Sequence, residues 1–268
     1  MVKCIVIGAA GRMGIRIINA IHNTEGVKLV GAIESKGHSR IGFDAGELSG
    51  IGKIDIPIID SFEEVGSDFD ALIDFTIPES SLNSLDYVAL KKKAAVIGTT
   101  GFSQQQTERI RKLAEDFPCV FAPNMSVGIN LMFKIISQLA QVLQDDYDIE
   151  IIESHHRLKK DAPSGTAVKM AQILANTLKR DLDQVAVHQR KGLIGERSRE
   201  EIGIQVIRAG DIVGEHTVLF AGPGERLEIT HRAHSRDTFA QGAVKAAQWV
   251  VKQQPGLYDM EDVLGLKQ

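Results

Sequence analysis

Residues 3–23 of the chain read KCIVIGAAGRMGIRIINAIHN and set its architecture. A short apolar run comes first, and glycines follow at positions 8, 11 and 14. Aliphatic side chains then recur at helical spacing up to Ile21, which predicts a strand, a glycine turn and a helix. Residues 27–35, VKLVGAIES, predict a second strand. The chain therefore opens with a β-α-β unit.

The alternation of strands and helices continues to about residue 123. Apolar runs predict further strands at residues 71–76, 94–101 and 119–124. Helical patterns between them predict helices at residues 79–92 and 104–116. Strands that alternate with helices in this way are typical of a doubly wound parallel sheet. The glycine-rich segment 36–53 is predicted to be a loop.

The pattern changes after residue 126. Helices are expected over 127–143 and 165–180, with a strand over 147–154 between them. The polar segment 183–201 is expected to be a loop, and strand-like runs follow it at 202–208, 212–222 and 225–233. Glycine and proline turns between these runs predict a mixed or antiparallel sheet. The fold class is therefore α/β, a Rossmann-like doubly wound parallel sheet with an inserted α+β domain.

The net charge of the chain is −4, so it carries no global basic field. We therefore expect neither nucleic acid nor a membrane surface as a partner. The first residues do not resemble a signal peptide, and no apolar stretch reaches the length of a membrane span. Cys4 and Cys119 lie in apolar runs without metal-ligand spacing, which is typical of buried thiols in a reducing compartment. These features predict a cytoplasmic protein.

The glycine turn is typical of a dinucleotide site. Gly8, Gly11 and Gly14 permit a tight turn and a close approach of the backbone to a pyrophosphate at a helix N-terminus. Glu34 ends the second strand, where a carboxylate meets the ribose hydroxyls of such a cofactor. The spacing departs from G-x-G-x-x-G because residue 10 is alanine, so a purely structural turn is the alternative. The surrounding β-α-β unit favours the dinucleotide.

Three residues bear on which cofactor is used. Arg12 either reaches the phosphates or adenine, or is a solvated arginine at the start of a helix. A 2′-phosphate requires a nearby donor or cation; Glu34 repels it, whereas Ser35 can donate and Lys36 offsets the repulsion. These residues leave NADH and NADPH both open.

Residues 153–167, ESHHRLKKDAPSGTA, concentrate positive charge before a helix. Ser164 is placed to cap that helix, which leaves the N–H groups of Gly165 and Thr166 facing outward. This arrangement suits a small dianion, with cationic side chains on one carboxylate and the helix N-terminus on the other. A solvated loop is the alternative, and no metal site is expected because adjacent histidines diverge. The cations and titratable rings are Arg157, Lys159, Lys160, His155 and His156.

Five motifs occur in order along the chain: GAAGRMG at 8–14, DFT at 74–76, GTTG at 98–101, APNMSVGIN at 122–130 and HHRLKKDAPSGTA at 155–167. With them the chain resembles the 4-hydroxy-tetrahydrodipicolinate reductase (dihydrodipicolinate reductase) family of bacterial and plant lysine biosynthesis. The resemblance runs from end to end, and the last motif is highly specific to that family.

The resemblance implies an oxidoreductase. Members of the family reduce 4-hydroxy-tetrahydrodipicolinate (dihydrodipicolinate), a cyclic dicarboxylate, to tetrahydrodipicolinate with NADH or NADPH, in diaminopimelate and lysine biosynthesis. The resemblance implies that His155 and Lys159 are the catalytic, proton-handling residues and that His156, Gly165 and Thr166 bind the substrate. The implied cofactor contacts are Gly8, Ala9, Ala10, Gly11, Arg12, Met13, Glu34, Gly98, Thr99, Thr100, Ala122, Pro123, Asn124 and Met125.

The resemblance also implies how the chain is organised. Residues 1–126 and 237–268 are expected to form a dinucleotide-binding domain, and residues 127–236 a substrate-binding and oligomerisation domain. The family is usually homotetrameric through the sheet of the second domain. Several relatives carry an arginine where this chain has Ser35, so dual use of the cofactors or a bias towards NADH is expected.

Two other functions fit part of the sequence: a catalytically silent NAD(P)-sensing protein, and a dehydrogenase of another small amino-acid precursor. A sensor does not need both His155 and Lys159, and the Ser-Gly-Thr helix start fits a dicarboxylate ring best, so the reductase is favoured. Lys159 is the favoured proton donor, with His155 as a polarising group or an alternate donor.

Overall fold

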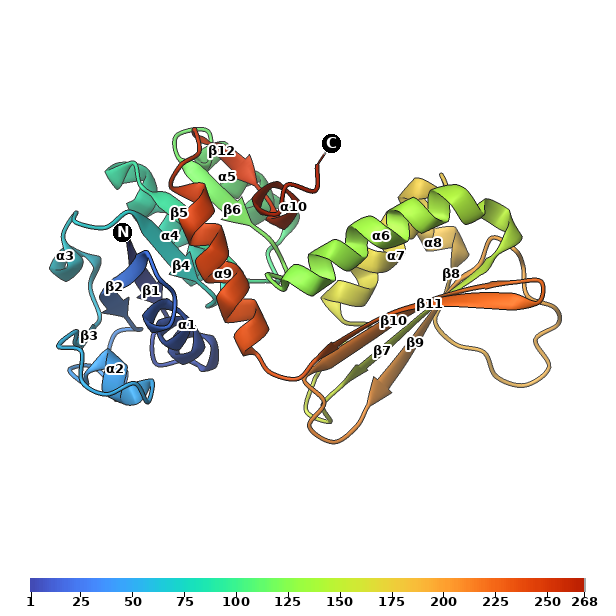
Figure 1. Cartoon of the computed structure of the whole chain (residues 1–268), viewed down its shortest axis with the longest axis horizontal. Coiled ribbons are helices and arrows are strands. Elements are labelled where there is room, and N and C mark those ends of the chain that lie inside the picture. Colours follow the sequence, from blue (N-terminus) through green and yellow to red (C-terminus); the bar gives the residue numbers. More distant parts are fainter. Residues whose placement is uncertain (268) are drawn as a thin grey trace. The chain divides into compact units, whose positions relative to one another are not determined.

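A sheet of seven strands, in which all neighbours are parallel, is the core of the first of two units (Figure 1). The computed structural model describes residues 1–267. Residues 1–127 and the segment from Arg236 onward form the first unit, and residues 128–235 form the second. The strands of the first unit are β1 (Val2–Ile7), β2 (Val27–Ile33), β3 (Ile58–Ile59), β4 (Ala71–Asp74), β5 (Ala94–Ile97), β6 (Pro118–Phe121) and β12 (Gly256–Tyr258).

The strand order of this sheet is β12-β6-β5-β4-β1-β2-β3, so the chain changes direction at β1. From β1 it moves through β2 to β3 on one side, and later through β4, β5, β6 and β12 on the other. Ligands of open parallel sheets bind outside the carboxyl ends of the strands at such a switch point. The glycine turn follows β1 at this point. The predicted doubly wound sheet is confirmed.

Helices cover both faces of the sheet because successive strand residues point to opposite sides. Cys4 and Val6 of β1 belong to a buried cluster with α1 and α9. Ile5 and Ile7 belong to a second cluster with α4 and α5. The helices of this unit are α1 (Arg12–His22), α2 (Ala45–Leu48), α3 (Phe62–Val65), α4 (Pro78–Lys91), α5 (Gln104–Leu113), α9 (Asp237–Val250) and α10 (Met260–Val263).

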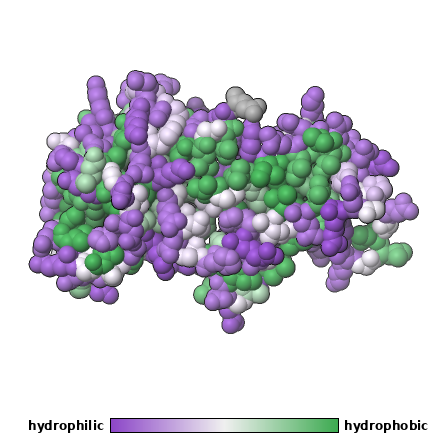
Figure 2. All heavy atoms as spheres, in the orientation of Figure 1, coloured by the Kyte–Doolittle hydropathy of each residue, from purple (hydrophilic) through white to green (hydrophobic). Residues whose placement is uncertain are grey.

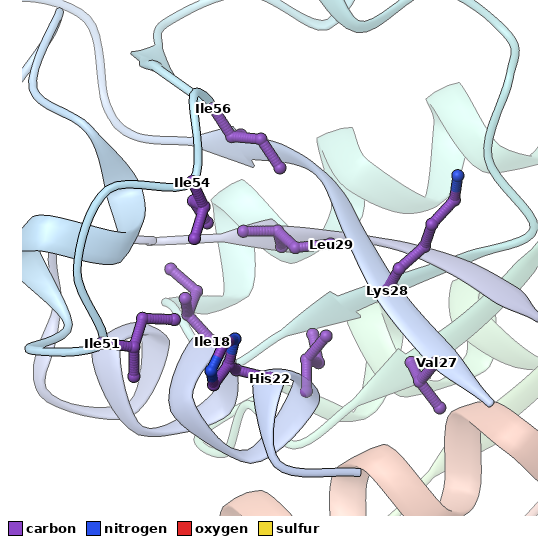
Figure 3. Close-up of a pocket in the computed structure, with 9 residues that line it drawn as sticks. Ile18, His22, Val27, Lys28, Leu29, Ile51, Ile54 and Ile56 are labelled. Carbon is purple, nitrogen blue, oxygen red and sulfur yellow. The ribbon is translucent and has the colours of Figure 1, made fainter. Parts of the chain in front are cut away.

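The segment after β2 is more ordered than predicted, because the short helix α2 interrupts the expected 36–53 loop. The Asp44 carboxylate caps this helix by accepting hydrogen bonds from the N–H groups of Gly46 and Glu47, and it also binds the backbone of Ile54 and Ile56. Isoleucines at 51, 54 and 56 turn towards α1 and β2 and line with them a cavity of about 250 Å³ (Figure 3). The glycine content of the segment obscured this local order.

The second unit contains a mixed five-stranded sheet in the order β11-β10-β7-β9-β8, which confirms the prediction. β7 and β8 each pair in parallel with β9, whereas β10 pairs antiparallel with both β7 and β11. The loop predicted over 183–201 begins later, since α8 and β8 occupy its first residues. The elements are α6 (Val127–Leu143), η1 (Gln144–Asp146), β7 (Asp148–His155), α7 (Gly165–Thr177), α8 (Leu182–Val185), β8 (Ala186–Val187), β9 (Ile202–Arg208), β10 (Gly214–Gly222) and β11 (Glu225–Ala233).

Helices α6 and α7 cover one face of this sheet (Figure 1). Along β7, four buried residues alternate with half-buried ones, so the buried set shares the face that meets the helices. Ile149 and Ile151 are the apolar members of that set, but Glu153 and His155 are polar. Buried polar groups must find partners within the protein.

Apolar side chains also remain on the surface of the second unit. Leu131 and Val142 on α6 are 45% and 79% exposed, and hydrophobic spheres follow this helix in Figure 2. The edge strand β11 is exposed along most of its length. Across residues 1–267, every helix is too short or too polar to cross a lipid bilayer.

Candidate active site

The turn after β1 presents backbone donors at the start of a helix. Gly8 has a φ of +68°, a left-handed conformation that favours glycine, and its carbonyl oxygen accepts a 2.9 Å hydrogen bond from Gly11 N. α1 begins at Arg12 without a capping side chain, so its first N–H groups are not satisfied by a cap. A Cβ atom at Gly14 would lie 2.1 Å from the Gly8 oxygen, so α1 packs directly against the turn. This geometry suits a phosphate group.

Glu34 folds back onto this turn. Its carboxylate accepts hydrogen bonds from Ala10 N at 3.1 Å and from Ser35 N at 2.8 Å. Glu34 also lines a hollow of about 350 Å³ at the ends of β1 and β2. Arg12 and Lys36 are exposed. The turn and the hollow together fit the phosphates and one ribose of a dinucleotide.

A buried carboxylate joins two neighbouring strand ends in the first unit. Asp74, the last residue of β4, is fully buried. Thr99 belongs to the GTTG motif after β5, so its hydroxyl links that motif to the end of β4. Asp74 appeared in the sequence only as part of the DFT motif, and its role as an acceptor was missed. Its donors are the N–H of Thr76 at 2.9 Å and the hydroxyls of Thr76 at 2.6 Å, Ser84 at 2.7 Å, Ser81 at 3.1 Å and Thr99 at 3.3 Å.

The predicted cofactor residues follow the carboxyl ends of four strands of one sheet. Gly8–Met13 and Glu34 lie after β1 and β2, Gly98–Thr100 follow β5, and Ala122–Met125 follow β6. The buried members, whose side chains support the backbone, are Ala9, Thr99, Ala122 and Met125. The members with partly or fully exposed surface are Gly8, Ala10, Gly11, Arg12, Met13, Glu34, Gly98, Thr100, Pro123 and Asn124.

In the second unit, the start of α7 is exposed at Gly165. The Ser164 hydroxyl caps this helix by accepting a 3.2 Å hydrogen bond from Ala167 N, as predicted. Gly165 is exposed, and a Cβ atom there would meet no other atom of the described residues within 4 Å beyond its own neighbours. The N–H groups of Gly165 and Thr166 therefore lie at a helix end whose dipole favours a carboxylate.

Glu153 is the centre of a buried polar cluster next to this helix start. Its carboxylate accepts hydrogen bonds from both terminal nitrogens of Arg208, each at 2.8 Å, and from Ser164 N at 2.9 Å. The Nδ1 atom of His155 lies 2.5 Å from the same carboxylate. Burial raises the pKa of Glu153, but the hydrogen bonds from His155, Arg208 and Ser164 outweigh burial and lower the pKa to about 2. Glu153 is therefore ionised at neutral pH.

The predicted cations lie in the loop between β7 and α7. The Nζ atom of Lys159 lies 2.9 Å from both carboxylate oxygens of Asp161. Arg157 and Lys160 are exposed, and His156 is half-buried. Because Ser164 N binds Glu153, this loop closes back on the end of β7. The structure thus brings the predicted catalytic and substrate residues together at one end of a single sheet.

Sequence reasoning assigned no role to Glu153 and missed two further members of the buried cluster. Arg208 is the register partner of His155 on β9, and His216 is the register partner of Glu153 on β10. His216 Nε2 lies 3.1 Å from the Ser164 hydroxyl oxygen, and burial and the nearby His155 lower the pKa of His216 to about 3. The apolar alternation of β10 places position 216 on the inward face, a signal that could have found this histidine.

Family models match almost the whole chain. Residues 2–125 match the model described as dihydrodipicolinate reductase, N-terminus, and residues 128–264 match the model described as dihydrodipicolinate reductase, C-terminus. The chain belongs to the dihydrodipicolinate reductase family. The resemblance that the five motifs indicated is thus confirmed.

Relatives of this dihydrodipicolinate reductase family member align over its full length. Proteins named 4-hydroxy-tetrahydrodipicolinate reductase from Syntrophus aciditrophicus (strain SB) and Geotalea uraniireducens (strain Rf4) are 57% and 55% identical over 267 residues, with 100% of both chains covered. A solved structure, dipicolinate-bound dihydrodipicolinate reductase from Paenisporosarcina sp. TG-14, is 26% identical, with a TM-score of 0.75 and 97% of each chain covered. An amine dehydrogenase from Mycobacterium smegmatis shares the fold, with 15% identity, a TM-score of 0.62 and coverage of 97% of this chain and 95% of that one.

Proposed function

We propose that this chain reduces 4-hydroxy-tetrahydrodipicolinate (dihydrodipicolinate) to tetrahydrodipicolinate with NADH or NADPH, as an oxidoreductase of diaminopimelate and lysine biosynthesis. The 57% identity to a full-length protein of that name supports this activity. The structural observation that carries the proposal is the exposed Gly165 at the start of α7, where Ser164 N binds the Glu153 carboxylate that His155 contacts and Lys159 lies in the preceding loop. A cyclic dicarboxylate needs an anion receptor next to a proton donor.

Residues of the first unit are proposed to bind the dinucleotide. The N–H groups at the start of α1 bind the pyrophosphate, with Gly8–Met13 forming the turn around it. Glu34 accepts hydrogen bonds from ribose hydroxyls, and Gly98–Thr100 and Ala122–Met125 contact the remainder of the cofactor. The tight packing of Gly14 on the turn and the hollow beside Glu34 support this assignment. When bound, the dihydronicotinamide supplies a hydride.

We propose that both cofactors are used and that NADH is favoured. The Glu34 carboxylate is bound by Ala10 N and Ser35 N, so moving it away from the ribose would cost two hydrogen bonds. In that position it repels a 2′-phosphate. The exposed Lys36 offsets part of the repulsion, which leaves NADPH usable.

Residues of the second unit are proposed to bind the dicarboxylate. One carboxylate meets the N–H groups of Gly165 and Thr166, and His156 contacts the substrate beside them. Addition of a hydride to the conjugated C=C–C=N system builds negative charge on the ring, which the cations of residues 157–160 stabilise. A 4-hydroxylated ring loses water before it accepts the hydride, so that hydride and proton together saturate one double bond.

Lys159 is proposed to supply the proton. Its ammonium group is held by the exposed Asp161 carboxylate, from which a substrate carboxylate can displace it. His155 then polarises the substrate or acts as the alternate donor. Either group can serve: the Lys159 ammonium carries its proton directly, and His155 donates from Nε2 when its ring is protonated on both nitrogens.

The proposal includes a homotetramer in the cytoplasm, without a nucleic-acid or membrane partner. The sheet of the second unit is the proposed contact surface. Its edge strand β11 is exposed, and exposed strands need a partner or a cover.

The activity is tested by following the absorbance of NADH and of NADPH in separate assays. The substrate is made in the assay from pyruvate and aspartate semialdehyde by the preceding synthase. We expect oxidation of both cofactors, with a higher kcat/KM for NADH. A folded protein that binds nucleotide but oxidises neither cofactor would instead be the catalytically silent sensor.

A further inference from the structure

Each oxygen of the buried Glu153 carboxylate has two partners. Oε1 accepts hydrogen bonds from Ser164 N at 2.9 Å and from Arg208 Nη2 at 2.8 Å. Oε2 accepts one from Arg208 Nη1 at 2.8 Å and lies 2.5 Å from His155 Nδ1. A lone charge at this fully buried position would be strongly destabilising, so these partners determine its state. Glu153 also shares the inward face of β7 with His155.

The hydrogen-bond partners of Glu153 determine which nitrogen of the His155 ring carries the proton. An ionised carboxylate only accepts hydrogen bonds, whereas a peptide N–H and a guanidinium only donate them. The remaining contact therefore requires His155 to donate from Nδ1, which leaves Nε2 without a proton in the neutral ring. Gly214 packs against Nε2, and a Cβ atom at this position would lie 3.1 Å from it, so any larger residue would crowd that nitrogen. Nε2 is the ring atom that remains for exchange with a ligand.

We propose that Glu153 is a positioning residue that holds His155 in the Nδ1–H tautomer and directs Nε2 to the substrate. This inference rests on the role proposed above for His155: Nε2 donates to the substrate when it has taken up a second proton, while Nδ1–H stays bonded to Glu153. Arg208 holds the carboxylate in place, and Ser164 N connects it to the start of α7. One buried carboxylate thus aligns the histidine ring with the helix end that receives the substrate carboxylate.

Glu153→Gln separates this role from simple packing. Two fixed donors, Ser164 N and Arg208 Nη2, face Oε1, and one, Arg208 Nη1, faces Oε2, so the amide oxygen is expected at Oε1 and the amide NH₂ at Oε2, beside Arg208 Nη1 and His155. The His155 ring must then accept at Nδ1 and carry its proton on Nε2. We expect kcat to fall about 100-fold or more, with the KM for NADH within about threefold of the wild-type value.

Glu153→Asp provides the conservative comparison. It keeps the charge and the acceptor at the cost of one methylene, so we expect it to retain the wild-type tautomer and a higher kcat than Glu153→Gln. A role in shape packing alone predicts the opposite order, because glutamine matches glutamate in shape and aspartate does not. A role in the buried ion pair with Arg208 alone predicts the same order but an unchanged His155 tautomer, so the ring spectra separate it from the proposal. A kcat for Glu153→Gln that equals or exceeds that of Glu153→Asp would overturn the proposal.

Long-range ¹H–¹⁵N NMR spectra read the tautomer without turnover. We expect the wild-type His155 ring to carry its proton on Nδ1 and the Glu153→Gln ring to carry it on Nε2, with the signals assigned from a His155→Gln spectrum. A wild-type ring protonated on Nε2 alone would refute the proposal even if no Glu153 variant folded. Full turnover by His155→Ala would refute the role of His155 in the reaction, and the tautomer result stands apart from it.

Glu150→Gln is the matched control. Glu150 also lies on β7 and is bound by Arg190 and Arg197, but it belongs to the half-buried set, on the face of the strand opposite to His155. We expect this variant to keep the His155 tautomer and a kcat within about threefold of wild type, with its assembly checked by light scattering. An equal loss of kcat in Glu150→Gln would show that any lost ion pair on this strand has the effect assigned to Glu153.

Discussion

The ring centroids of His155 and His216 lie 5.2 Å apart, but the two rings have different hydrogen-bond partners. His155 donates to the ionised Glu153, and its other ring nitrogen remains for a ligand. Burial and the neighbouring His155 lower the pKa of His216 to about 3, so its ring is neutral at physiological pH. His216 contacts the Ser164 hydroxyl that caps α7, and we therefore assign it to the support of the helix start.

The low pKa of His216 makes the folded state sensitive to acid. An unfolded histidine binds a proton near pH 6.5, whereas folded His216 resists it until about pH 3, so stability present above pH 6.5 is lost as the pH falls. Between about pH 7.5 and pH 5 this loss amounts to about 2 kcal/mol. We expect His216→Gln to show a shallower fall of melting temperature over that range. Burial also lowers the pKa of His231, so part of the slope remains.

Exposed His22 on α1 provides the control for this experiment. We expect His22→Gln to keep the wild-type slope. Parallel melting curves for wild type and His216→Gln at every pH would contradict the assignment.

Glu34 is expected to set the cofactor preference. Replacing its carboxylate with an amide removes the charge that repels a 2′-phosphate but keeps an oxygen acceptor. We expect Glu34→Gln to raise the ratio of kcat/KM for NADPH to that for NADH about tenfold, which corresponds to roughly 1.4 kcal/mol. Glu47→Gln on α2, which is exposed, should leave the ratio unchanged. An unaltered ratio in Glu34→Gln would show that Glu34 does not face the 2′ position.

At the level of helices and strands, the sequence predicts best the elements whose characteristic residues lie close together in the chain. The apolar run and the three glycines predict β1, the turn and α1, and Ser164 marks the start of α7. Strand register depends on residues far apart in the sequence, so no local pattern could place Arg208 beside His155. The short helix α2 was missed because its cap at Asp44 lies within a glycine-rich segment.

The Asp74 cluster ties β4, β5 and α4 together and is expected to support cofactor binding. Asp74→Ala leaves several buried donors without an acceptor, and each unsatisfied group costs about 1–3 kcal/mol. The backbone of the GTTG motif should then lose its fixed position. We expect NADH affinity to fall about tenfold or more, measured by fluorescence titration, together with a lower melting temperature.

Asp86→Ala is the control, since Asp86 also lies on α4 but forms an exposed ion pair with Arg109. Exposed pairs contribute at most about 1 kcal/mol, so NADH affinity should stay at the wild-type level. Unchanged affinity in Asp74→Ala would mean that the cluster stabilises the fold without supporting the cofactor segments.

Over the whole molecule, the fold class and the family could be predicted because five motifs occur in order through both units. The candidate site could be predicted only in part. Residues that we propose to contact a ligand lie in the turns that the motifs mark, whereas Glu153, Arg208 and His216 lie within strands. The sequence alone does not distinguish buried polar residues of that kind from other strand residues, because their hydrogen-bond partners lie far away in the chain.

Assembly is expected to use the sheet of the second unit. Leu219 on β10 lies between Glu150 on β7 and Glu228 on β11. An arginine at position 219 would therefore face two carboxylates within its own subunit, so Leu219→Arg should not disturb the fold of that subunit. We expect wild type to have a mass of about 117 kDa by light scattering, four times 29.3 kDa, and Leu219→Arg to form smaller species. Leu131→Arg on exposed α6 should remain tetrameric. A monomeric wild-type protein would rule out this surface as a tetramer contact.

The most direct test compares turnover of wild type, His155→Ala and Lys159→Ala with NADH, using substrate generated from pyruvate and aspartate semialdehyde, alongside NADH affinity. We predict that wild type oxidises NADH and that both variants lose about 100-fold or more in kcat while NADH affinity stays within about threefold. The variant with the larger loss identifies the proton donor. Wild-type turnover in either variant would contradict the assignment of that residue, and full turnover in both would show that the α7 cluster is not the reactive site.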